Sequence, residues 1–175
     1  MKVFVPIIAV SALLASTVSG WSEVVSGDLQ VRIVIGEACK VNPGGSAELH
    51  FGSRGDVTGA ATTANTTKDG KGSIQVQCSK GTKFSIALGD GKNPDPNGTI
   101  VRNMKNGTGE TIPYELYSDS TNKTLWGSGS KSGSPLASEA TGGLDSFQVF
   151  GLIPKQPKNP KTGTYEDTVA VTVTF

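Results

Sequence analysis

Apolar and polar residues alternate along the segment that follows the first twenty residues of this chain. The odd positions hold Val25, Gly27, Leu29, Val31, Ile33 and Ile35. The polar residues Ser26, Asp28, Gln30 and Arg32 lie between them, and Val34 breaks this polar run. A period of two predicts a β-strand with one apolar face. An exposed apolar edge strand promotes aggregation, so we expect this strand to pair with a groove on a partner.

The last segment of the chain alternates in the same way. Its larger side chains fall on one face, which consists of Tyr165, Val169, Val171, Val173 and Phe175. Both ends of the mature chain are therefore predicted to be strands. The pattern alone allows these strands to pair within one molecule or between molecules.

Short apolar runs separated by turn residues fill the rest of the chain. Together with the two terminal segments, they predict strands at 28–36, 46–52, 72–79, 83–89, 98–104, 111–118, 145–152 and 165–175. The Gly/Ser-rich stretch 127–143 is predicted to be a surface loop. No segment keeps helical periodicity over ten residues. Regularly spaced strands of this kind predict an all-β antiparallel sandwich.

The first twenty residues are organised as a secretory signal peptide. Lys2 precedes an apolar core at 3–14, and small residues follow. We expect cleavage after Gly20, with Ser22 as the alternative. The apolar core is too short to cross a bilayer and no second apolar run follows, so we expect no membrane span. The remainder, about 155 residues, is enough for one domain.

The charge and the cysteine content of the chain limit the kinds of partner it can bind and indicate its redox compartment. Without Lys2 the chain carries 15 basic and 15 acidic residues and no basic run, so we expect no nucleic-acid partner. Two cysteines in an exported chain, Cys39 and Cys78, predict one disulfide and an oxidising compartment. A metal site there would lack ligands, because His50 is the one histidine and no CxxC pair occurs.

No residue pattern indicates catalysis. A serine–histidine–acid triad would have to use His50, and no serine lies in a G-x-S-x-G turn. Carboxylate pairs such as Glu37 with Glu48, or Glu115 with Asp119, could meet in space, but so could any two acidic residues. These pairs therefore do not indicate acid–base catalysis. We expect no catalytic residue, no cofactor and no metal.

Two stretches resemble binding sites, but structural explanations fit both of them better. NPDPNG at 93–98 matches the start of a calcium loop, but Met104 stands where that loop has a glutamate, which favours a hairpin loop. The aromatic residues Tyr114, Tyr117 and Trp126 could form a sugar-binding platform, but the apolar spacing around them favours packing.

Several stretches, taken in order, match a known family. They are GEACKV around Cys39, SIQVQCSKGTKFSIALGDG around Cys78, VRNMKNGTGETIPYELYSD, and the closing FQVFGLIPKQPKNPKTGTYEDTVAVTVTF. With them the chain resembles the spore coat U domain family, which includes subunits of archaic chaperone–usher pili such as the Csu pilus. The resemblance covers nearly the whole mature chain.

The resemblance implies an immunoglobulin-like antiparallel β-sandwich that is incomplete in the monomer and is completed by a donated N-terminal strand. The signal peptide would be residues 1–20, the donor strand 21–36 and the pilin-like body 37–175. The donor face would be Val25, Gly27, Leu29, Val31, Ile33 and Ile35, and the acceptor groove would contain Tyr165, Val169, Val171, Val173 and Phe175.

The resemblance also implies a structural subunit of a bacterial surface pilus that supports adhesion and biofilm formation. Its partners would be copies of itself or related subunits, a periplasmic chaperone and an outer-membrane usher, and it would pass through the periplasm to the cell surface. Two alternatives stay open. One is a spore-coat or matrix protein of the same fold whose N-terminal strand pairs within its own chain, and the other is a secreted carbohydrate-binding module.

Overall fold

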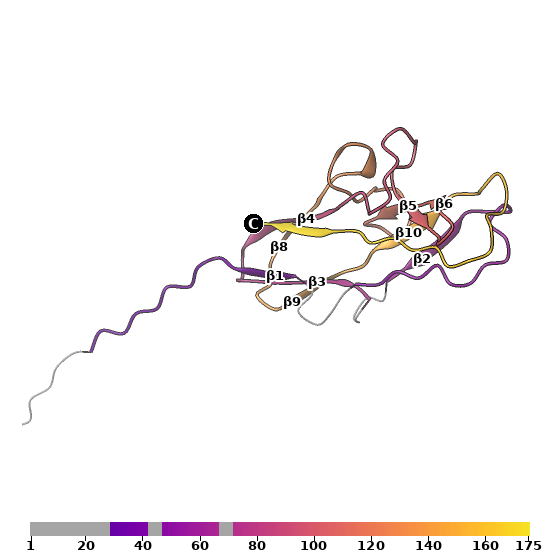
Figure 1. Cartoon of the computed structure of the whole chain (residues 1–175). Coiled ribbons are helices and arrows are strands. Elements are labelled where there is room, and N and C mark those ends of the chain that lie inside the picture. Colours follow the sequence, from indigo (N-terminus) through magenta and orange to yellow (C-terminus); the bar gives the residue numbers. More distant parts are fainter. Residues whose placement is uncertain (1–28, 42–46, 67–71) are drawn as a thin grey trace, which may run out of the picture. The chain divides into compact units, whose positions relative to one another are not determined.

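The structure, a computed structural model, describes residues 29–41, 47–66 and 72–175 (Figure 1). The chain divides into two units, residues 1–33 and residues 34–175. All strands of the described residues belong to the second unit, which is called the body below. Residues 29–38 belong to no helix or strand.

Short strands make up the described part of the body, together with one 3₁₀ turn at Ser130–Ser132. The strands are β1 (Cys39–Val41), β2 (Thr62–Asn65), β3 (Ile74–Cys78), β4 (Lys83–Leu88), β5 (Asn103–Lys105), β6 (Thr111–Pro113), β7 (Glu115–Tyr117), β8 (Leu136–Glu139), β9 (Leu144–Phe147), β10 (Phe150–Ile153) and β11 (Val171–Thr174).

Two three-stranded sheets form the layers that matter most for the candidate site. Their strand orders are β1-β3-β9 and β11-β4-β8, and every pair in them is antiparallel. Figure 1 shows the first as a lower layer and the second as an upper layer. A third sheet, β2-β10-β7, and the β5–β6 hairpin extend the body beyond them. The all-β antiparallel fold predicted from the sequence is confirmed.

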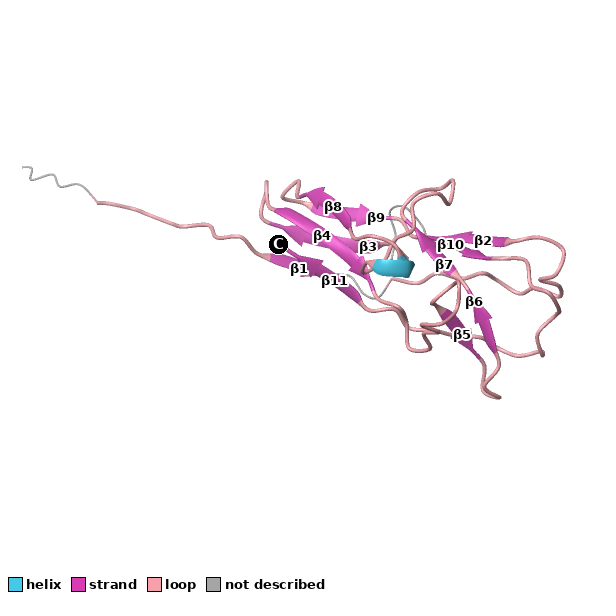
Figure 2. Ribbon diagram, turned by 90° about the horizontal axis from the view of Figure 1, so that it is seen from above, coloured by secondary structure: helices cyan, strands magenta, loops and turns pink. Residues whose placement is uncertain are grey.

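Two short connections carry the chain from one layer to the other. Residues 79–82 join β3 to β4, and residues 140–143 join β8 to β9. The first connection joins the middle strands of the two sheets, and the second joins their edge strands β8 and β9. On the other side lie β1 and β11, which Figure 2 shows together, away from β8 and β9.

The core lies between these layers because β3 and β4 each present an alternating apolar face to it. The buried residues are Ile74, Val76 and Cys78 on β3, and Phe84, Ile86 and Leu88 on β4. The rings of Phe84 on β4 and Phe147 on β9 meet edge to face, 5.9 Å apart, which joins the two sheets. Trp126 completes the core, and its indole N–H donates to the Ile86 carbonyl oxygen at 2.8 Å.

Most of the predicted strands correspond to strands in the structure, but several predictions differ from it. The strand predicted at 28–36 is absent from its described residues, because 29–36 have no neighbouring strand to pair with. Of the strand predicted at 98–104, only Asn103 and Met104 belong to a strand, β5. The strand predicted at 46–52 is wrong for its described residues, since 47–52 form no ladder, although Ala47, Leu49 and Phe51 pack against the core as their alternation requires. The polar strand β2 was missed because threonine and asparagine resemble turn residues. β8 was also missed, because it lies inside the stretch predicted to be a loop.

The Gly-rich stretch after Trp126 is packed against the body. Gly127 and Ser132 are buried, and a Cβ on Gly127 would lie 2.3 Å from the Ser132 carbonyl oxygen. Gly133 adopts a φ of 99°, which favours glycine, beside the Leu125 carbonyl. Glycine is therefore required at both positions by backbone packing.

A single disulfide joins β1 to β3. Cys39 and Cys78 are partners in the β-ladder, with Cα atoms 4.1 Å apart, so the predicted disulfide is present. β1 is only three residues long and pairs on one side, and the covalent bond holds it in register at the edge of its sheet.

We predict that Gly127→Ala lowers the free energy of unfolding by about 1–3 kcal/mol, because the new methyl group would overlap the Ser132 backbone. Urea denaturation measures the change. Gly107→Ala is the matched control, since nothing lies within 4 Å of a Cβ built there. Equal stability of the two variants would contradict the packing described here.

Removing the disulfide as Cys39→Ala with Cys78→Ala should lower the free energy of unfolding by about 4 kcal/mol. The estimate follows from the loop entropy released when the 39-residue separation is no longer closed. The unfolding midpoint in urea reports it. Under reducing conditions the wild type and the variant should converge, and an unchanged midpoint under oxidising conditions would disprove the prediction.

Candidate functional site

An exposed apolar segment precedes the first strand of the body. The exposed fractions of Leu29, Val31, Ile33, Val34 and Ile35 are 86%, 87%, 80%, 73% and 74%. The other two residues of the predicted donor face, Val25 and Gly27, lie outside the described residues. Side chains of this size are normally buried, and several in a row mark an interaction surface.

The chain becomes fixed to the body directly after this segment. The Ser79 hydroxyl donates to the Gly36 carbonyl oxygen at 3.0 Å, and the Ser79 backbone N–H donates to the Ala38 carbonyl oxygen, also at 3.0 Å. Cys39 follows, bonded to Cys78. Only residues 36–38 lie between the apolar segment and β1.

Two sheet edges on one side of the body have a partner on one side only. In the described part of the chain, β1 pairs with β3 alone and β11 pairs with β4 alone. Each therefore presents unpaired backbone N–H and C=O groups along its other edge. Such edges can accept an extended strand, which adds backbone hydrogen bonds and places alternate side chains against the core.

Burial falls from the middle strands toward these edges. The predicted acceptor residues Tyr165, Val169, Val171 and Val173 pack against the core and are only half-buried, and Phe175 is 56% exposed. On β1, Val41 is 38% exposed. The apolar residues of both edges thus retain accessible area that a further strand would cover.

The body also contains a buried arginine, Arg102, whose structural role the sequence patterns do not indicate. The Arg102 guanidinium donates to the carbonyl oxygens of Leu88, Gly89 and Trp126 at 2.9, 2.8 and 3.0 Å. Burial lowers the pKa of Arg102. The Arg102 side chain connects the end of β4 to the segment that carries Trp126. In the sequence, the one feature that marks Arg102 is its place as a single arginine next to an apolar run.

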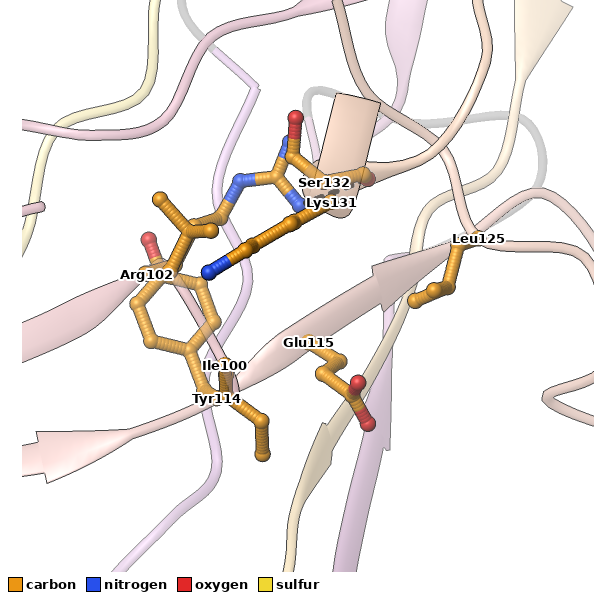
Figure 3. Close-up of a pocket in the computed structure, with 8 residues that line it drawn as sticks. Ile100, Arg102, Tyr114, Glu115, Leu125, Lys131 and Ser132 are labelled. Atoms are coloured by element: carbon orange, nitrogen blue, oxygen red, sulfur yellow. Dashed lines mark hydrogen bonds between the residues drawn. The ribbon is translucent and has the colours of Figure 1, made fainter. Parts of the chain in front are cut away.

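The space beside Arg102 is too small for a ligand. Figure 3 shows the guanidinium close to Ser132, with the Tyr114 ring and the Lys131 side chain also lining this pocket. Its volume is about 10 Å³, which is room for one water molecule. The arrangement is architectural.

Tyr114 and Asp167 form a second polar cluster nearby. The Tyr114 hydroxyl donates to Asp167 at 2.6 Å, and the other carboxylate oxygen accepts the Lys92 backbone N–H at 2.8 Å. Burial and the bond to Asp167 raise the pKa of Tyr114. The Tyr114 side chain is thus used in packing and cross-linking, as expected from its sequence context.

The other chemistry-bearing residues serve local structure. His50 is exposed and contacts Glu48 at 3.2 Å, and the Tyr117 hydroxyl donates to Glu115 at 2.7 Å. Asp119 accepts several N–H and O–H groups of its own loop, which lowers its pKa. Among the described residues, no three metal-ligating side chains gather, and no helix is long and apolar enough to cross a membrane.

Comparison with known proteins places these features in a family context. The profile of the Spore Coat Protein U domain matches residues 25–172. Protein U of Myxococcus xanthus is 31% identical over 180 residues, which cover all of this chain and 98% of that protein. The resemblance inferred from the sequence is confirmed.

A solved structure is also similar. It is the crystal structure of a chaperone–tip adhesion subunit pre-assembly complex from archaic chaperone–usher Csu pili of Acinetobacter baumannii. One of its chains matches with a TM-score of 0.54 and 25% identity, over 81% of this chain. The match spans 40% of the length of that chain.

Replacing the buried arginine tests the architectural role given to it. Arg102→Met should lower the free energy of unfolding by at least about 3 kcal/mol, because three backbone carbonyls would lose their donor. Urea denaturation is the measurement. The exposed Arg54→Met should change it by less than about 0.5 kcal/mol. Similar values for the two variants would contradict the role.

Proposed function

This chain belongs to the Spore Coat Protein U domain family, and from that premise we propose that it is a structural subunit of a bacterial surface pilus, polymerised head to tail by donor-strand complementation. The observation that carries the proposal is the exposed apolar segment before β1, in a body whose strands β1 and β11 each have an unpaired edge. The family is one of structural pilus and coat domains rather than of enzymes.

In the proposed mechanism, the N-terminal segment of one subunit enters between β1 and β11 of the next. Its backbone hydrogen-bonds to the free edges, and Leu29, Val31, Ile33 and Ile35 cover the half-buried residues there. Burying four such side chains is worth about 6–12 kcal/mol. Each subunit then offers one donor and one acceptor, a head-to-tail contact that does not close and therefore grows a fibre.

The proposal assigns residues 1–20 to a signal peptide, 21–36 to the donor strand and 37–175 to the body. A periplasmic chaperone would lend a strand to the open edges until the donor of another subunit replaces it, and an outer-membrane usher would export the fibre. The similar solved structure is itself that of a chaperone–subunit complex. The protein would act at the cell surface in adhesion and biofilm formation, without a cofactor.

A second candidate function is favoured by one observation. The similarity to Protein U extends over nearly the full length of both proteins, whereas the matched chain of the solved complex is much longer than this chain. A spore-coat or matrix protein could use the same body with its N-terminal strand paired within its own chain. The two candidates differ in whether the strand links molecules.

We predict that Val31→Asp and Ile33→Asp each abolish fibres seen by electron microscopy, because a charge on the apolar face would be buried in the neighbouring subunit. The same variants should still co-purify with the periplasmic chaperone, which shows that the body folds. Arg32→Asp, on the polar face, is the matched control and should assemble normally. Normal fibres from Val31→Asp and Ile33→Asp would contradict the assignment of the donor face.

A further inference from the structure

A polar hollow lies beside the β5–β6 hairpin and has no role in the proposed assembly. Its volume is about 280 Å³. The residues whose chemistry matters here are Asn93, Asp95, Asn103, Lys105 and Thr111. This volume is just below the range of pockets that hold drug-sized ligands, so it suits a smaller molecule.

Strand alternation explains why polar side chains gather on this side of the hairpin. Asn103 and Lys105 are two residues apart on β5 and share one face, and Thr111 on β6 is the register partner of Lys105. Met104 and its partner Ile112 occupy the opposite face and pack with the core. The hairpin therefore presents an amide, an ammonium and a hydroxyl group together.

The walls of the hollow are held in place by backbone hydrogen bonds. The Asp95 N–H donates to the Val101 carbonyl oxygen at 2.7 Å, which fixes the loop that carries Asn93 and Asp95. On the other side, Lys105 and Glu166 exchange two backbone hydrogen bonds, at 2.9 and 3.2 Å. The site is thus preformed.

Several polar groups of the lining remain available to a ligand. Asn103 is only 8% exposed, and its amide nitrogen donates to the Val101 carbonyl oxygen at 3.2 Å, which leaves the amide oxygen as an acceptor. Asp95 uses one carboxylate oxygen for the N–H groups of Asn97 and Gly98. In the part of the chain that the structure describes, no ion pair joins Asp95 to Lys105. Opposite charges therefore line one hollow without contacting each other.

We propose that this hollow binds one neutral hexose unit at the end of a glycan chain. Each sugar hydroxyl both donates and accepts, which suits a lining of a carboxylate, amides, an ammonium and a hydroxyl. The single acidic and single basic side chain balance, which fits an uncharged ligand. Pro94 offers an apolar surface to the ring. The inference does not depend on strand exchange, because all these residues belong to the body.

Saturation-transfer NMR tests the site on the purified mature chain, with the methyl glycosides of glucose, galactose and mannose as probes. We expect at least one glycoside to bind. Lys105→Ala should weaken that binding at least about tenfold, since it removes one charge-assisted hydrogen bond, and Thr111→Val should weaken it as well. The backbone bonds of Lys105 are kept in the first variant, so the fold is retained. Lys123→Ala, an exposed lysine outside the hollow, is the control and should bind normally.

No saturation transfer to any of the three glycosides would overturn the proposal. Equal binding by the wild type, Lys105→Ala and Thr111→Val would also overturn it, because the sugar would then bind elsewhere. If binding is found, polysaccharide from the expressing cells and an unrelated glycoprotein are used as competitors. The stronger competitor shows whether the sugar comes from the cell's own matrix or from a foreign surface.

Discussion

The unpaired edges of β1 and β11 are the constraint on which this structure depends. Backbone N–H and C=O groups along a sheet edge remain open to another strand, and here two such edges lie on the same side of two packed layers. Short connections join the middle strands β3 and β4 and the edge strands β8 and β9. The core is tightly covered around β3 and β4 and only half covered near β1 and β11.

The rest of the body keeps those edges in position without a partner. The Cys39–Cys78 bond holds the three-residue β1 in register. Ser79 fixes the chain from Gly36 onward, and the buried Arg102 binds the carbonyl oxygens at the end of β4, the partner of β11. Because these links are covalent or made to backbone atoms, they depend little on the identity of the surface side chains, and the proposed acceptor edges keep their position.

Sequence patterns predicted what depends on local alternation and missed what depends on distant partners. The faces of β3, β4 and β11 followed from their period of two. Residues 47–51 alternate and face the core, yet they form no ladder, because pairing requires a neighbouring strand that the pattern cannot reveal. The Arg102 guanidinium donates hydrogen bonds to carbonyl oxygens of two separate segments. The hollow beside β5 is lined by residues of a loop and of the β5–β6 hairpin. Neither arrangement has a signature within one stretch of sequence.

The central claim is that the N-terminal segment links one molecule to the next. Gel electrophoresis in SDS, before and after boiling, tests it most directly on the mature protein and on a version lacking residues 21–35, each co-expressed with a periplasmic chaperone and an usher. The account predicts a ladder of oligomers that collapses on boiling and is absent from the truncated protein. Monomer alone from both proteins, or the same ladder from both, would contradict it.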